Sequence, residues 1–123
     1  MDQDWNDNQP IYRQLRDRVV DMILEGVLSE GDALPSVRNV ATEYQINPLT
    51  VLKAYQALQD EELVDKRRGR GMFVREGAVK RLRSSERQQF LEQEWPQILE
   101  RIERLGLEAS ELLKQAGRKE KNS

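Results

Sequence analysis

Residues 35–74 have the sequence PSVRNVATEYQINPLTVLKAYQALQDEELVDKRRGRGMFV. Ser36 follows a proline and can cap a helix, which is expected to bury Val37, Val40, Ala41 and Tyr44 on one face. After a short corner, Asn47 and Pro48 indicate the start of a second helix, because asparagine caps helices and proline is favoured at their first position. Two short helices joined by a sharp corner and followed by a hairpin predict a winged helix-turn-helix.

The second helix has one face toward the core and one toward the outside. Val51, Tyr55 and Leu58 recur at spacings of four and three residues, which predicts that they are buried. Recognition helices read base edges from their N-terminal end. The outward-facing residues nearest this end, and therefore our candidate DNA-binding residues on this helix, are Asn47, Leu49, Thr50 and Lys53.

The hairpin carries the strongest local charge in the chain. Between Lys66 and Arg83 there are eight basic residues and one acid, whereas the whole chain has 20 basic and 22 acidic residues and a net charge of −2. A basic stripe on an otherwise acidic protein can bind a polyanion if the stripe alone faces it. Glycine lets the tip turn tightly and lets backbone approach a phosphate. The candidate DNA-binding residues at the tip are Arg67, Arg68, Gly69, Arg70 and Gly71.

Composition excludes several other classes of function. The chain has 123 residues without cysteine or histidine, which removes disulfides, the usual zinc ligands and a Ser-His triad. No phosphate-binding glycine motif is present either. We therefore expect no enzyme activity, no cofactor and no metal. No apolar run is long enough to cross a membrane and no signal peptide is recognisable, so we expect a soluble cytoplasmic protein.

The flanking segments complete a winged domain. Pro10 is expected to start a scaffold helix that ends near Gly26, and residues 32–34 are expected to add a short strand beside the hairpin. Leu63 and Val64 are expected to pair with the strand after the tip. The fold class is α+β and mainly α. The chain divides into a flexible N-terminus, the winged helix-turn-helix domain, a two-helix dimerisation region and a frayed tail, at residues 1–9, 10–76, 77–117 and 118–123.

The C-terminal region is predicted to form two amphipathic helices. The first runs from Glu86 to Leu105, after a junction at Ser84-Ser85, and the second from Glu108 to Gln115. Pro96 is expected to kink or break the first, because proline removes a helical hydrogen bond. Two helices cannot bury their apolar faces on each other alone, which favours a homodimer. The candidate dimer residues are Phe90, Leu91, Trp95, Ile98, Leu99, Ile102, Leu105, Leu112 and Leu113.

Three segments carry a resemblance to a known family. Residues 35–41, 47–51 and 69–74 closely resemble the N-terminal motifs of the GntR family of bacterial transcription regulators, in the same order and spacing. The tail resembles the YtrA-type branch, whose regulators carry two helices after the winged domain and often control transporter operons. The resemblance implies a DNA-binding fold and a homodimer that binds an inverted repeat.

The resemblance also implies roles for single residues. Arg38 matches a DNA-contacting arginine, Thr50 a recognition-helix contact, and Gly69, Arg70 and Gly71 the wing tip. We add Ser36, at the start of the first motif, to the candidate DNA-binding residues. Many family members have basic residues where this chain has Pro48 and Leu52, so Asn47, Lys53 and the wing must supply more of the contacts.

These observations predict a sequence-specific DNA-binding regulator that acts as a homodimeric repressor on a palindromic operator. The alternative is a protein-interaction or adaptor module, since winged helices also serve in that role with the DNA face unused. A third interpretation, a regulator gated by a small molecule, differs from the first only in its effector. The basic hairpin favours DNA over an adaptor, because an adaptor needs such a stripe only for an acidic partner.

Overall fold

The computed structural model describes residues 5–121, with side chains up to residue 117, so the ends of the predicted flexible N-terminus and of the predicted frayed tail lie outside the described residues. The chain forms two compact units, one up to Arg83 and one from Ser84 onward. The first unit therefore extends past Glu76, where the sequence placed the end of the winged domain. The reason is that Ala78 and Leu82 are buried in its core.

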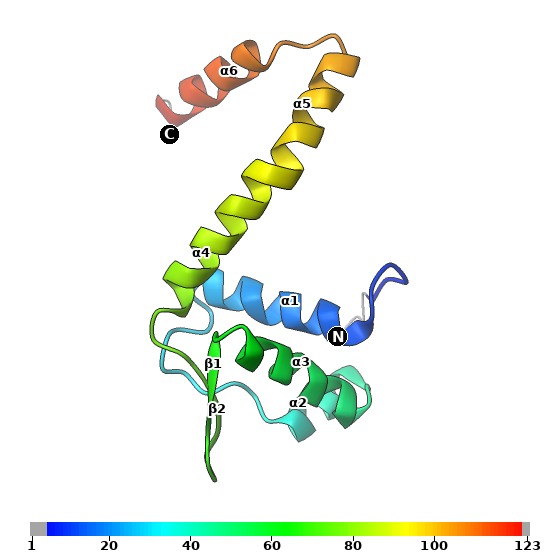
Figure 1. Ribbon diagram of the computed structural model, residues 1–123, viewed down its shortest axis with the longest axis vertical. Helices are drawn as coiled ribbons and strands as arrows, with labels where there is room; N and C mark the ends of the chain where they lie inside the picture. Colours follow the sequence, from blue (N-terminus) through cyan, green and yellow to red (C-terminus); the bar gives the residue numbers. More distant parts are fainter. Residues whose placement is uncertain (1–4, 122–123) are drawn as a thin grey trace. The chain divides into compact units, whose positions relative to one another are not determined.

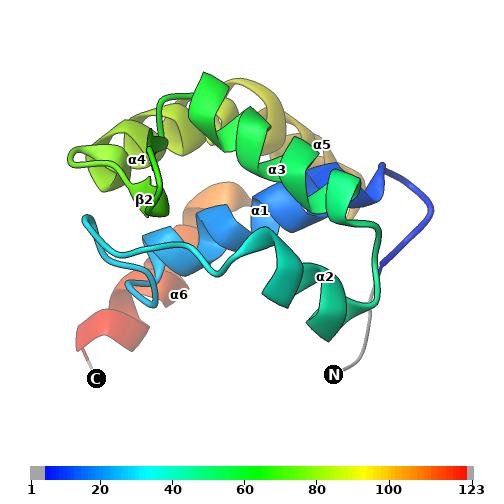
Figure 2. The same ribbon diagram turned by 90° about the horizontal axis from the view of Figure 1, so that it is seen from below.

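Three helices, a hairpin and the start of a fourth helix make up the first unit (Figure 1). The helices are α1 (Ile11–Leu24), α2 (Val37–Tyr44) and α3 (Pro48–Asp60). Figures 1 and 2 show α1 lying against α3, with α2 and the start of α3 in front of α1 when seen from below. The mainly helical α+β fold class is confirmed.

The core of this unit contains the residues that the helical periodicity selected. Val51, Tyr55 and Leu58 of α3 are buried, and α1 contributes Leu15, Val19, Val20 and Ile23. On α2 the prediction was partly wrong. Val40 and Ala41 are buried, whereas Val37 and Tyr44 are half-buried at the edge of the core.

The hairpin is a two-stranded antiparallel sheet of β1 (Val64–Arg67) and β2 (Gly71–Val74). Val64 pairs with Val74 and Arg67 with Gly71. On the other side of β2, the predicted strand at 32–34 is reduced to a single bridge between Ala33 and Phe73. Leu63 lies just before β1, and its carbonyl accepts a hydrogen bond from the Arg75 N–H at 2.9 Å. The Leu63–Arg75 hydrogen bond continues the hairpin pairing at its base, where the segment 31–34 also bonds to the outer edge of β2, while the tip projects away from the helices (Figure 1).

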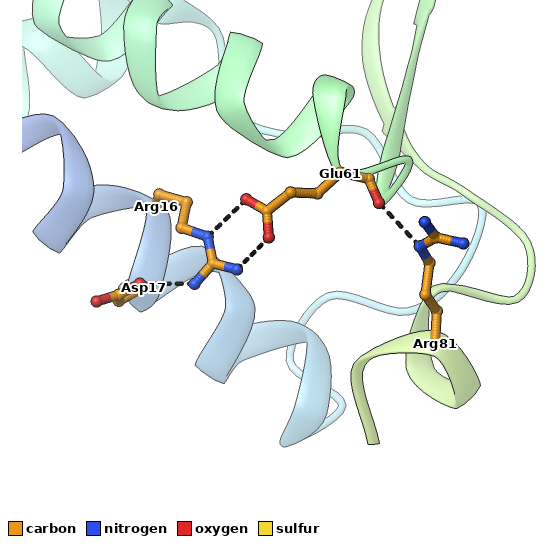
Figure 3. Close-up of polar contacts among 4 residues, drawn as sticks. All are labelled: Arg16, Asp17, Glu61 and Arg81. Atoms are coloured by element: carbon orange, nitrogen blue, oxygen red, sulfur yellow. Dashed lines mark hydrogen bonds and ion pairs between the residues drawn. The ribbon is translucent and has the colours of Figure 1, made fainter. Parts of the chain in front are cut away.

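A polar network ties the C-terminal end of α3 to α1 and to the start of α4 (Ala78–Gln89), as Figure 3 shows. The Arg16 guanidinium donates two hydrogen bonds to the Glu61 carboxylate and one to Asp17. These partners, above all Glu61, raise the pKa of Arg16 above its ordinary value. Arg81 donates to the Glu61 carbonyl at 2.9 Å and forms an ion pair with Glu62 at 2.9 Å. The network fixes both the direction of α3 and the start of α4.

The second unit contains the helical tail. The predicted junction at Ser84-Ser85 coincides with the boundary between the two units, but the helix does not begin there, because both serines lie inside α4. A π-helical turn, η1 (Phe90–Glu94), joins α4 to α5 (Trp95–Arg104), and α6 (Ala109–Lys121) follows. This π-helical turn lies directly before Trp95 and Pro96, where a kink or a break was predicted. The Trp95 N–H bonds to the Phe90 carbonyl five residues back, and this wider turn accommodates a proline that has no N–H to donate. The helix α6 extends past the predicted end at Gln115.

Candidate nucleic-acid interface

Local hydrogen bonds define the corner between α2 and α3. The Ser36 hydroxyl accepts a hydrogen bond from the Asn39 N–H at 3.1 Å, and the Asn47 side-chain oxygen accepts one from the Leu49 N–H at 2.9 Å. Gln45 ends α2 in the left-handed region, with φ of 54°. Both predicted helix caps are confirmed, and Pro48 lies at the first position of α3.

Tyr55 of α3 connects this helix to the segment that leads into α2. Its hydroxyl donates to the Pro35 carbonyl at 2.7 Å, and the residue is only 2% exposed. Burial, with a smaller contribution from nearby Tyr44, raises the pKa of Tyr55 to about 12. The hydroxyl is a donor at neutral pH, and its hydrogen bond connects α3 to the segment that leads into α2.

The start of α3 is open to solvent. Leu49 is 70% exposed, Asn47 and Lys53 are exposed, and Thr50 is half-buried. Arg38 of α2 is also exposed and lines a shallow groove of about 530 Å³ between α2 and the start of α3. The structure therefore brings the predicted residues of the two helices to one corner. Ser36 is exposed as well, although its oxygen already serves as the cap of α2.

One contact at this corner was not predicted. The Lys53 ammonium lies 4.2 Å from the centre of the Tyr12 ring, near the start of α1. Tyr12 is half-buried against the core. No local sequence signal marks this pair, because the two residues meet only through the packing of α1 on α3.

The tip of the hairpin, residues 67–71, is exposed to solvent. Gly69 and Gly71 have φ of 74° and 99°, conformations that residues with a side chain rarely adopt, and the Arg70 N–H closes the turn on the Arg67 carbonyl at 2.9 Å. Arg68 and Arg70 are exposed, as is Arg67, whose guanidinium lies 4.2 Å from the centre of the Phe73 ring. With Lys66, these arginines form a compact group of exposed cations that we call the wing cations.

The basic stripe predicted between Lys66 and Arg83 is less uniform than its charge count suggests. Arg75 lies 3.8 Å from both Glu62 and Asp65, and Arg81 lies 2.9 Å from Glu62. These acids belong to the turn between α3 and β1 and to β1 itself, and they offset the charge of the two arginines. Of the basic residues in this stripe that form none of these ion pairs, four are the wing cations, and the other two, Lys80 and Arg83, lie on α4.

Within residues 5–121, no cluster of three or more acidic, cysteine or histidine side chains could hold a metal ion. In the same range, no helix is both long and apolar enough to span a membrane.

Two short helices joined at a corner, the second with an exposed start, and a basic two-stranded hairpin in the same unit define a winged helix-turn-helix protein, a class that places its second motif helix in a DNA groove. The chain belongs to the family described as bacterial regulatory proteins, gntR family, which it matches over residues 11–74. The family resemblance of the three sequence motifs is thus confirmed.

The similarity of this chain to some relatives extends beyond the winged domain. The chain is 41% identical over 75 residues to the HTH-type transcriptional repressor YtrA of Bacillus subtilis, covering 61% of this chain and 58% of YtrA. It is 32% identical over 115 residues to the HTH-type transcriptional regulator YhcF of the same organism, covering 92% of each. A solved GntR-family regulator from Bacteroides thetaiotaomicron superposes with a TM-score of 0.72 at 34% identity, covering 91% of this chain and 97% of that one.

These matches confirm the resemblance to YtrA-type regulators. The chain spans less than two thirds of YtrA but nearly the whole of YhcF and of the Bacteroides protein. All three are described as transcription regulators, which agrees with the expectation that this chain is not an enzyme.

Proposed function

We propose that this protein is a homodimeric transcription repressor that binds an inverted-repeat operator. The observation that carries the proposal is that the exposed start of α3 and the wing cations belong to one compact unit, whose remaining acids are partly paired. Repression follows the name of its relative YtrA, and the YtrA-type resemblance suggests a transporter operon as the target.

The proposed contacts divide into two kinds. The wing cations and Arg38 bind phosphates, which supplies most of the affinity and makes it depend on salt. Asn47, Leu49, Thr50 and Lys53 lie against base edges in the major groove and supply the choice of sequence. Because neither Pro48 nor Leu52 can donate a side-chain hydrogen bond, base recognition depends on the other residues of α3.

The tail forms the proposed interface between the two copies of the chain. Apolar side chains along η1, α5 and α6 are exposed, among them Leu91, Ile98, Leu105 and Leu113. Phe90 and Trp95 stack on each other with ring centres 6.2 Å apart. Pairing these faces between two chains removes them from water, and a two-fold pair presents two α3 helices to the half-sites of a palindrome.

The direct test is a titration of the purified protein with a duplex from upstream of its own gene and with a scrambled duplex, at two salt concentrations. The proposal predicts tight, salt-sensitive binding to the upstream duplex alone. Equal weak binding to both duplexes would contradict sequence-specific recognition. No binding at low salt would favour the adaptor alternative.

The wing assignment has its own test. Arg70→Ala should weaken binding to every duplex and lower the slope of log affinity against log salt by about one unit, because one phosphate contact is lost. Arg87→Ala is the matched control, since this exposed arginine lies on α4 in the tail unit. An unchanged salt slope in Arg70→Ala would contradict the assignment.

A further inference from the structure

Lys53 is the only basic residue of α3, and its ammonium contacts the ring of Tyr12. The helix has the sequence PLTVLKAYQALQD, in which the one acid, Asp60, is at the opposite end. None of the ion pairs among the described side chains includes Lys53. Its ammonium instead lies 4.2 Å from the centre of the Tyr12 ring, within the range in which a cation is attracted to an aromatic face.

The contact between Lys53 and Tyr12 lies in a surface groove. A shallow groove of about 370 Å³ between the start of α1 and the first turns of α3 is lined by Pro10, Ile11, Tyr12, Leu49, Thr50 and Lys53. Leu49 and Thr50 precede Lys53 by four and three residues, so the three side chains share one face of the helix. The lysine therefore lies beside two of the candidate base-reading residues.

The two partners differ in mobility. Tyr12 is half-buried and packs against the core, which fixes its ring, whereas Lys53 is exposed and its four-carbon stem has many rotamers when free. An attractive ring beside the ammonium restricts those rotamers before DNA arrives. Less conformational entropy is then lost on binding, and the charge is presented at one position.

We propose that Tyr12 is a positioning residue, which fixes the Lys53 ammonium beside Leu49 and Thr50 and so sets the sequence preference of α3. The inference rests on the proposed function, because it assigns a role within operator binding. Tyr12 itself needs no contact with DNA for this role.

A double-mutant cycle tests the coupling. Tyr12→Leu should weaken operator binding about two- to fivefold, the range expected from an exposed cation–π contact, and Tyr12→Phe should restore it because the ring is kept. In a Lys53→Met background, Tyr12→Leu should change nothing. Equal weakening in both backgrounds, or a Tyr12→Phe protein as weak as Tyr12→Leu, would overturn the proposal.

Sequence selection from a random duplex pool separates positioning from simple packing. Tyr12→Leu and Lys53→Met should select the same altered motif, whereas Tyr12→Phe should select the wild-type motif. Thermal unfolding checks that the variants are folded. If Tyr12→Leu does not fold, the comparison of Lys53→Met with wild type and Tyr12→Phe still decides, since an unchanged motif in Lys53→Met would overturn the proposal.

A measurement without DNA distinguishes this inference from the proposed function. In the NMR spectrum of the free protein, the ε-methylene protons of Lys53 should be shifted upfield by the ring in wild type and in Tyr12→Phe, but not in Tyr12→Leu. Absence of this shift in wild type would overturn the positioning and leave operator binding intact. If the wild-type protein shows the upfield shift but binds no operator, the proposed function is overturned instead, and the role of Tyr12 in DNA binding with it.

Discussion

The unit up to Arg83 buries its apolar side chains, and the unit from Ser84 does not. Every buried hydrophobic residue among the described side chains lies between Leu15 and Leu82. In the tail, Leu91, Leu105 and Leu113 are 54%, 63% and 62% exposed, and α5 has no buried residue at all. Apolar side chains thus have opposite outcomes in the two units. The winged unit closes its own core, whereas the tail needs a second surface to cover its apolar faces.

The largest effect should come from the closed core. Leu58→Ala removes a fully buried side chain of α3 and should lower the free energy of unfolding by about 2–5 kcal/mol, through lost burial and the cavity left behind. The matched control is Leu49→Ala on the same helix, 70% exposed, which should change stability by less than about 0.5 kcal/mol. Urea denaturation measures both. Equal losses would mean that the burial of α3 is not as described.

The tail should respond through association instead. Ile98→Asp combined with Leu99→Asp places charges on the apolar face of α5 and should weaken self-association at least about a hundredfold, because charges are costly to bury in an interface. Gln97→Asp adds a charge at a polar position of the same helix and serves as the control. Sedimentation equilibrium reads the association constant. A double variant that still dimerises like wild type would place the interface elsewhere.

Local signals made the motif predictable. The cap at Ser36, the Asn47-Pro48 start and the glycines of the tip each act within three or four residues, and the structure has all of them. Periodicity likewise identified Val51, Tyr55 and Leu58 as core, because these positions repeat with the helix.

What escaped prediction depends on residues that are distant in sequence. Tyr12 meets Lys53 only after α1 packs on α3, and Glu62 offsets Arg81 only after the chain turns back. The serines at 84 and 85 indicated the start of a helix because serine favours helix caps, yet burial of Ala78 and Leu82 starts α4 earlier and carries it through them. The roles of the wing and of α3 in DNA binding, and of the tail in dimerisation, stay predictions.

A smaller effect should follow from the polar network within the winged unit. Arg16→Met leaves the Glu61 carboxylate without its main partner in a partly buried position and should cost about 1–3 kcal/mol of stability. Arg13→Met, on an exposed position of the same helix, is the control. Thermal unfolding of both proteins tests this. A loss no larger in Arg16→Met than in Arg13→Met would show that the network contributes nothing to the closed unit.

The smallest effect concerns the start of α4. The Glu30 carboxylate accepts hydrogen bonds from the Gly77 and Val79 N–H groups, and these bonds lower the pKa of Glu30 below its ordinary value of 4.5. A lowered pKa in the folded state means that the stabilisation is present above pH 4.5 and is lost as the pH falls through the folded-state pKa. Glu30→Gln should therefore melt below wild type at pH 7 and together with it at lower pH.

The matched control for this pH dependence is Glu25→Gln, in which the same change is made at an exposed position just after α1. A difference between Glu30→Gln and wild type that persists unchanged at low pH would mean that the carboxylate charge is not what stabilises the start of α4.

The central claim is that the winged unit binds DNA and that the tail unit forms the dimer. Native mass spectrometry tests it most directly, on the free protein and on its complex with a duplex from upstream of its own gene. The account predicts a free species of twice the 14.4 kDa chain mass and a complex of two chains on one duplex, with the Ile98→Asp, Leu99→Asp protein appearing as single chains. A wild-type protein that is a single chain, both free and on the duplex, would contradict it.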